Sequence, residues 1–208
     1  MSKINEPKIK KELIKKSIND LNECEKIIDY SFMDETLEYS LENVEINGCI
    51  FKNIDFSKVS IKNCDLIDCI FDSCNLANSF INEKLFLRVK FVNCSLVGIN
   101  IIDSSIKHCY FTDSNLSYMN ISCKLNNVCF NNCKMNNSRL LENKLENVII
   151  NNCDLSNSEI YKTLMDGIDL SNSNIENIIS DINSVKGVTV SMSGMIDLSR
   201  IFGIKIKF

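Results

Sequence analysis

The sequence predicts an all-β protein whose chain winds into a stack of square coils. The first observation is a five-residue period, in which Leu66, Phe71 and Leu76 each follow a cysteine by two positions. This period fits neither the 3.6 residues of a helical turn nor the two-residue repeat of a strand. A fixed short period means that each unit buries its apolar side only by stacking on copies of itself.

The second observation is a phenylalanine in every fourth unit. Central apolar residues run in steps of five from Leu41 to Ile121 and, after one missing residue, from Leu125 to Ile175. If four units close one turn, residues 20 apart lie above one another, which aligns Phe51, Phe71, Phe91, Phe111 and Phe130. These units suffice for about seven coils, and a coil spacing of ~4.8 Å gives a shaft on the order of 34 Å long.

Small residues occupy the position two before each central residue, which a narrow interior requires. A free cysteine packs as a small hydrophobe, so most of the cysteines are predicted to point inward: Cys49, Cys64, Cys69, Cys74, Cys94, Cys109, Cys123, Cys133 and Cys153. Val59, Val89, Val128, Ser79, Ser104, Ser138 and Ser158 take the same position in other units. Cys129 is out of register and is predicted to face outward.

Neither a metal site nor a catalytic site follows from these residues. Zinc needs ligands that converge, whereas Cys64, Cys69 and Cys74 belong to three different faces of a coil. His108 precedes the inward Cys109 and should face solvent, which opposes a Cys/His catalytic pair. Gly-rich phosphate loops and a Gly-x-Ser-x-Gly turn are absent from the sequence. We therefore expect a non-enzymatic protein without cofactor or metal.

Composition and charge narrow the class of protein. The chain has 208 residues, a net charge of −4 and one histidine. Acidic residues exceed basic ones in 41–183, and basic residues predominate in 184–208, which argues against direct nucleic-acid binding. No apolar run is long enough for a membrane span, and no signal peptide is recognisable. We expect a cytoplasmic protein with reduced thiols.

The N-terminal segment is predicted to form a short amphipathic helix over residues 5–24. Pro7 suits a first helical turn, and apolar residues follow it at helical spacing: Ile9, Leu13, Ile14, Ile18 and Leu21. This helix would cover the first strand edge. A membrane-surface helix is the alternative, because Lys10, Lys11, Lys15 and Lys16 lie on the other side, although Glu12, Asp20 and Glu23 interrupt that face. Residues 1–40 are assigned to this helix and to an irregular first coil around Ile27, Phe32 and Leu37.

Two stretches interrupt the regular repeat. Lys84 takes an inward position in residues 82–88, and Asn143 does so in residues 138–145, on the same face. A buried lysine without a partner is costly, so a local bulge is expected there. The irregularity is either tolerated or a surface for a partner. The candidate contact residues are Lys84, Leu85, Leu87, Arg88, Leu141 and Glu142.

The C-terminal segment, residues 184–208, is predicted to close the stack. Residues 185–190 are predicted to form a last strand, and Ser191 is predicted to cap a helix from Met192 to Phe202. Gly203 is expected to terminate this helix, and residues 204–208 are expected to form a final strand. One side of the helix would form a two-fold contact between chains through Met192, Met195, Ile196, Ser199 and Phe202.

The repeat resembles the pentapeptide-repeat family, as residues 74–78 (Cys-Asn-Leu-Ala-Asn) and 153–157 (Cys-Asp-Leu-Ser-Asn) illustrate. Residues 186–190 and 202–206 are similar to the tail of the Qnr-like proteins of Gram-positive chromosomes. The resemblance implies a right-handed quadrilateral β-helix that dimerises through its C-terminal helices. It also implies a DNA mimic that binds DNA gyrase and topoisomerase IV and protects them from quinolones.

Several functional hypotheses remain open from the sequence. Protection against a gyrase-directed toxin is a variant of the DNA-mimic hypothesis. A structural or interaction module with a non-topoisomerase partner is the alternative, and an enzyme is a third hypothesis. The long loop that interrupts the repeat in plasmid-borne Qnr proteins has no counterpart in this sequence. The modest net charge means that DNA mimicry would depend on shape and on local acidic stripes.

Overall fold

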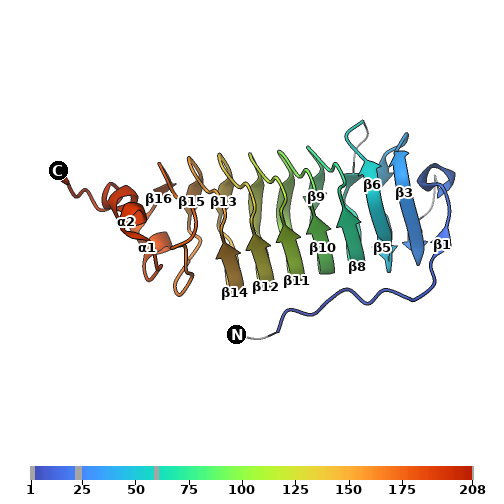
Figure 1. Cartoon of the computed structure of the whole chain (residues 1–208), viewed down its shortest axis with the longest axis horizontal. Helices are drawn as coiled ribbons and strands as arrows, with labels where there is room; N and C mark the ends of the chain where they lie inside the picture. The colour runs from blue at the N-terminus through green and yellow to red at the C-terminus, as the bar shows by residue number, and fades with distance from the viewer. Residues whose placement is uncertain (1–2, 22–24, 59–60, 208) are drawn as a thin grey trace.

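The computed structural model describes residues 3–21, 25–58 and 61–207 of the chain. It confirms the predicted fold class, a quadrilateral parallel β-helix of about eight turns with small helical ends. Figure 1 shows the turns stacked side by side along one long axis, with the helices of the C-terminal end at the far end of the stack. Val59 and Phe208, which figure in the sequence predictions, lie outside the described residues.

Most of the strands are short, as a coil with four corners requires, although the two longest continue past a corner without a break. They are β1 (Ile14–Lys15), β2 (Lys26–Ile28), β3 (Tyr30–Thr36), β4 (Leu41–Glu42), β5 (Glu45–Asn47), β6 (Ile50–Asp55), β7 (Ile61–Lys62), β8 (Asp65–Asp72), β9 (Phe80–Asn82), β10 (Leu85–Val92), β11 (Asn100–Thr112), β12 (Asn120–Asn131), β13 (Arg139–Leu141), β14 (Lys144–Asn151), β15 (Glu159–Tyr161) and β16 (Ile179–Ser180). The helical elements are η1 (Ile18–Leu21), α1 (Ile182–Val185) and α2 (Met192–Ser199).

Each coil has four faces, named here after the central residues of one coil as the Leu66, Phe71, Leu76 and Ile81 faces. All strand pairs between described residues are parallel, and Phe71 pairs with Phe91 in the next coil. The register shortens by one residue where Ile102 pairs with Ser122 but Ser105 pairs with Lys124. The shift corresponds to the step of four residues, instead of five, between Ile121 and Leu125 in the sequence. That coil therefore has one corner residue fewer.

The opening coil is more regular than the sequence indicated. Ile27 pairs with Ile46, and Phe32 pairs with Phe51, so this coil stacks on the next one with a spacing of 19 residues. The spacing returns to 20 at Leu41, which pairs with Ile61. The step from Leu37 to Leu41 is four residues instead of five, which accounts for the different phase of the five-residue repeat before Leu41.

The predicted phenylalanine ladder is confirmed inside the shaft. Ring centroids of Phe51 and Phe71 lie 4.6 Å apart at an interplanar angle of 6°, and those of Phe71 and Phe91 lie 5.0 Å apart at 13°. Phe111 and Phe130 continue the stack at 4.9 Å, and Phe32 extends it by one coil at 5.1 Å from Phe51. These distances are those of favourable offset stacking, so from Phe32 to Phe130 one face of each coil packs ring on ring against its neighbour.

The inward cysteines are buried as predicted, and their thiols also make hydrogen bonds that the sequence analysis did not anticipate. The Sγ of Cys69 lies 3.1 Å from the carbonyl oxygen of Ile67 and 3.5 Å from that of Ile46 in the preceding coil. Serines in the same position behave alike, since the Oγ of Ser158 donates to the carbonyl of Met135 at 2.9 Å. These small residues therefore satisfy backbone carbonyls at the corners. Cys129 is half-buried on the outer surface.

The abundant asparagines have a conformational role at the corners. In most units the residue two after the central residue adopts a positive φ, as Asn53 does at 52° and Asn93 at 53°. Asn, Asp and Gly tolerate this left-handed region better than other residues. Many corner positions are therefore asparagine because of their backbone geometry. Since asparagine is uncharged, much of the outer surface is neutral.

The predicted N-terminal helix over residues 5–24 is wrong. Residues 3–10 are extended and run along the outside of the shaft (Figure 1), only Ile18–Leu21 form a 3₁₀ turn, and residues 22–24 lie outside the described part. A short isolated helix is marginal in water. Contacts with the shaft, described below, favour the extended form instead. The segment 3–10 is called the strap.

The C-terminal end differs in detail from the expectation. The predicted strand over residues 185–190 is reduced to a single bridge between Thr189 and Asp169. Val185 instead ends helix α1, which Asp181 caps by accepting from the backbone of Ser184 at 2.9 Å. Ser191 caps α2 as predicted, accepting from Gly194 at 3.1 Å. Gly203, with a φ of 67°, follows its end. Residues 204–207 form no strand, which corrects the last prediction.

Candidate interaction surfaces

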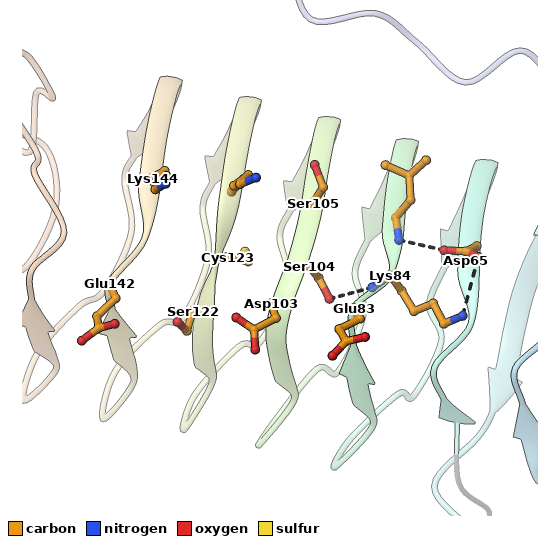
Figure 2. Close-up of a pocket in the computed structure, with 12 residues that line it drawn as sticks. Asp65, Glu83, Lys84, Asp103, Ser104, Ser105, Ser122, Cys123, Glu142 and Lys144 are labelled. Atoms are coloured by element: carbon orange, nitrogen blue, oxygen red, sulfur yellow. Dashed lines mark hydrogen bonds and ion pairs between the residues drawn. The ribbon is translucent and has the colours of Figure 1, made fainter.

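A charged groove lies at the corner between the Ile81 and Leu66 faces (Figure 2). It has a volume of about 580 Å³ and crosses several coils. Carboxylates and lysines both line it: Asp65, Glu83, Asp103, Glu142, Lys84, Lys124 and Lys144. The groove spans the place where the coil after Ile121 lacks its corner residue. The missing residue therefore explains the hollow.

Lys84 lines this groove and is not buried in the shaft. Its side chain is 27% exposed, and its Nζ lies 4.0 Å from Oδ2 of Asp65. Strand β10 pairs with both neighbouring strands without a register shift, so the bulge expected over residues 82–88 is wrong. A flexible side chain that reaches out of the corner relieves the burial penalty more easily than a backbone bulge would.

Asn143 occupies the equivalent position three coils away and is fully buried. Its Oδ1 accepts from the backbone of Cys123 at 2.9 Å, and its Nδ2 donates to the carbonyl of Ile121 at 3.0 Å and to the hydroxyl of Thr163 at 3.3 Å. Each amide atom therefore has a partner in a neighbouring turn. A buried polar group satisfied in this way ties three coils together.

Replacing Asn143 with alanine should lower the free energy of unfolding by about 2–4 kcal/mol, because buried groups of Cys123 and Ile121 would lose their partner. Thermal and urea unfolding would measure the loss. The matched control is Asn172→Ala, since Asn172 is exposed and outside the positive-φ corners. Equal stabilities of the two variants would contradict the role given to Asn143.

The groove does not contain a recognisable catalytic group. Cys123 lines it, but burial raises the pKa of this thiol to about 12, so the thiolate is scarce at neutral pH. Among residues 3–21, 25–58 and 61–207, no three His, Cys, Asp or Glu side chains gather closely enough to hold a metal ion. The groove is chemically suited to binding a partner through paired charges.

The structure brings together only some of the predicted contact residues. Lys84, Leu85 and Glu142 line the groove, whereas Leu87 and Leu141 are half-buried elsewhere on the corner strands. Arg88 lies on the opposite edge of the Leu66 face, where its Nε donates to Oδ1 of Asp68 at 2.5 Å. The six residues therefore do not form one surface.

Asp68 is the best-buried carboxylate of the shaft surface. Burial by itself would raise the pKa of this carboxyl, but hydrogen bonds from Arg88 and from the backbone N–H of Lys8, together with the Arg88 charge, hold the pKa below its ordinary value. Arg88 makes a bidentate contact through a second bond of 2.6 Å. Such paired geometry is stronger than a single ion pair.

The low pKa of Asp68 predicts a loss of stability in acid. A carboxyl with a depressed folded-state pKa stabilises the fold above the unfolded value of about 3.9 and ceases to do so as the pH falls through the folded value. Asp68→Asn should therefore flatten the pH dependence of the melting temperature below about pH 4. Asp103→Asn, at an exposed carboxylate, is the comparison variant. An unchanged profile for Asp68→Asn would refute this assignment.

The C-terminal end carries an apolar groove of about 610 Å³, lined by Met195, Leu198, Ser199, Phe202, Ile204 and Ile206. Met195 is 53% exposed and Phe202 is 46% exposed. Of the other residues predicted for a dimer contact, Met192 is exposed outside the groove, and Ile196 lies in a polar hollow beside Asn174 and Asp197. Ile204 and Ile206 were missed because a final strand was expected there.

Carboxylates predominate on the outer edge of the Phe71 face and on the Leu76 face. The acidic residues at these positions are Asp34, Glu38, Asp55, Asp72, Asp113, Asp154 and Glu176, and the lysines are Lys52, Lys58 and Lys134. The repeat register spreads these carboxylates over several columns along the shaft. The charge is interspersed with Asn and Ser, so it forms a stripe of moderate density.

Comparison with protein-family models agrees with this architecture. A model of the pentapeptide repeat region matches residues 39–121 and 84–160. Among curated proteins, none matches the chain significantly. Full-length QnrB1, a plasmid-mediated fluoroquinolone resistance protein, is similar at 22% identity and a TM-score of 0.49, over 91% of this chain and 95% of that one.

Two further solved structures are similar to the chain. A trypsin-treated variant of QnrB1 is 21% identical with a TM-score of 0.46, over 88% of this chain and 100% of that chain. HetL, which is involved in heterocyst differentiation regulation in the cyanobacterium Nostoc sp. strain PCC 7120, is 15% identical with a TM-score of 0.36, over 80% of this chain and 83% of that one. The strap and the C-terminal end lie outside the region that the repeat model matches.

Proposed function

The chain belongs to the pentapeptide-repeat family, and from this premise we propose that it is a non-enzymatic protein that mimics duplex DNA toward DNA gyrase and topoisomerase IV. The observation that carries the proposal is the acidic stripe along the Phe71 and Leu76 faces. A straight shaft that displays carboxylates along two neighbouring faces reproduces two features that a DNA-binding groove recognises, which are shape and negative charge.

The tail of the sequence supports the same proposal. Residues 186–190 and 202–206 resemble the tail of Qnr-like proteins, and in the structure Phe202, Ile204 and Ile206 of the second segment line the apolar groove at the end of the shaft. We propose that two chains dimerise there and form a rod of about twice the shaft length. Two shafts of about eight coils at ~4.8 Å make a rod of roughly 75–80 Å, comparable with about 22 base pairs of DNA.

The proposal is tested by gyrase supercoiling with and without a fluoroquinolone, across a titration of the protein. Restored supercoiling in the presence of drug is the expected result. Inhibition without protection would indicate a DNA mimic that only competes. A variant with Asp72, Asp113 and Asp154 changed to Asn tests the stripe, and Glu83→Gln with Asp103→Asn in the groove is the control. No effect of the wild-type protein in either condition would overturn the proposal.

An interaction module with a partner other than a topoisomerase is the second candidate. The mixed-charge groove favours it, because alternating carboxylates and lysines have no counterpart on DNA. The strap favours it as well, since it exposes Lys3, Lys8 and Lys10 along one side of the shaft. Pull-down with gyrase subunits separates the two candidates before any enzymatic assay.

No helix of the described residues is long and apolar enough to cross a bilayer.

A further inference from the structure

We infer that the shaft carries a binding site for an extended peptide and that the strap, residues 3–10, occupies this site as a built-in competitor. The site lies at the corner between the Leu66 and Phe71 faces. The partner that fits it is an extended segment of another protein that carries apolar residues and one carboxylate at the spacing of the strap. This inference is independent of binding to topoisomerases.

The contacts of the strap follow the coils one by one. The backbone N–H of Lys8 donates to Oδ1 of Asp68 at 2.8 Å, the carboxylate of Glu6 pairs with Lys90, and the carbonyl of Ile4 accepts from the hydroxyl of Tyr110 at 3.0 Å. Lys90 pairs with Tyr110 in the strand register, and Asp68, Lys90 and Tyr110 belong to three successive coils. Every second residue of the strap therefore meets the next coil. Two extended residues span about 6–7 Å, which crosses one ~4.8 Å coil spacing obliquely.

The shaft presents ordered groups for these contacts. Arg88 holds the carboxylate of Asp68 through two bonds of 2.5 and 2.6 Å, and the Nζ of Lys90 lies 5.3 Å from the centre of the Tyr110 ring. The backbone N–H of Asn5 donates to Nδ1 of His108 at 3.3 Å. Proteins commonly bind extended peptides through hydrogen bonds to the peptide backbone, while contacts with only some of the peptide side chains provide specificity.

Apolar contact accompanies these polar bonds. Ile4 is only 7% exposed, although it lies outside the core of the shaft. Ile50, Ile70, Lys90 and Tyr110 form a half-buried outward column in register on the shaft, and Pro7 and Ile9 of the strap are likewise half-buried. These covered apolar residues are interspersed with exposed Asn5, Glu6, Lys8 and Lys10, so the strap lies against the shaft with its apolar side chains and leaves its polar side chains largely in solvent.

The strap is attached weakly enough to be displaced. Lys10 and Glu6, which make ion pairs with Asp29 and Lys90, have side chains that are 69% and 57% exposed, and exposed ion pairs contribute little. Its contacts with the shaft, unlike those of the coils, involve no strand pairing until β1 meets β3. Segments with few buried contacts open most easily.

The test uses the full chain and a labelled peptide of residues 3–13. In the release variant, Ile4→Asp and Glu6→Ala weaken the strap. We expect this variant to bind the peptide at least about tenfold more tightly than the wild type, in which the tethered strap competes at an effective concentration near millimolar. A peptide of the same composition in scrambled order is the control. Equal binding to both proteins, or equal binding of the scrambled peptide, would overturn the inference.

A charge exchange keeps the test independent of folding defects. Adding Lys90→Glu to the release variant should abolish binding of the natural peptide, and a peptide with Glu6→Lys should restore it. Circular dichroism of both variants verifies that the β-helix is intact. If the release variant instead forms higher oligomers in light scattering and binds no added peptide, the occupant is a second copy of the chain, and a separate peptide partner is excluded.

Discussion

Replacing Phe91 with alanine is expected to lower the free energy of unfolding by about 3–5 kcal/mol. Phe91 is fully buried, and its ring stacks between those of Phe71 and Phe111 at 5.0 Å on both sides. The substitution removes buried apolar surface and leaves a cavity in the middle of the shaft. In a solenoid each coil contacts only its neighbours, so both interfaces of one coil are weakened.

Urea unfolding followed by circular dichroism measures this loss. Phe80→Ala is the matched control, because Phe80 is an aromatic residue of the shaft that is 43% exposed. Its replacement should change the free energy of unfolding by less than about 1 kcal/mol. A near-neutral result for Phe91→Ala would show that the ladder contributes little to stability, whatever its geometry.

A charge in the C-terminal groove is expected to convert the proposed dimer into a folded monomer. Met195→Lys places an ammonium in a groove whose other lining residues are almost all apolar, and burying an unpaired charge at an interface is strongly unfavourable. Because Met195 is half-exposed in the single chain, the substitution should leave the fold and its melting behaviour largely intact.

Multi-angle light scattering gives the molar mass of each variant. Leu164→Lys is the control, since Leu164 is 64% exposed but lies on the shaft, away from the groove. It should leave the oligomeric state of the wild type unchanged. A dimer that persists in Met195→Lys would refute an interface in this groove.

The candidate sites were less accessible to sequence reasoning than the shaft. Lys84 and Asn143 were identified as exceptions to the repeat, but the sequence did not show that one reaches outward to Asp65 while the other is satisfied inside. The difference depends on the length of the side chain. A lysine side chain extends past the corner, whereas the short amide side chain of asparagine finds hydrogen-bond partners in adjacent coils. The groove lies where the coil after Ile121 lacks a corner residue. The repeat pattern showed the position of the missing residue but not that a groove forms there.

The N-terminal prediction failed for a related reason. Apolar spacing over residues 9–21 is compatible with a helix, and composition does not distinguish a helix from a strap. The extended form is stabilised by Asp68, Lys90 and Tyr110, which lie some 60 to 110 positions away in the chain. No local pattern contains that information.

The sequence by itself determined the shaft, its four faces and the phenylalanine ladder. Each five-residue unit contains a central inward residue, a small inward residue and a corner residue. Because this pattern repeats along the shaft, the register between coils follows from the local sequence. Only the tertiary structure decided the path of the strap, the hydrogen bonds of the inward thiols and the loss of the final strand. The physical reason is that these features depend on contacts between distant residues, or on the absence of a further coil to pair with at the end of the stack.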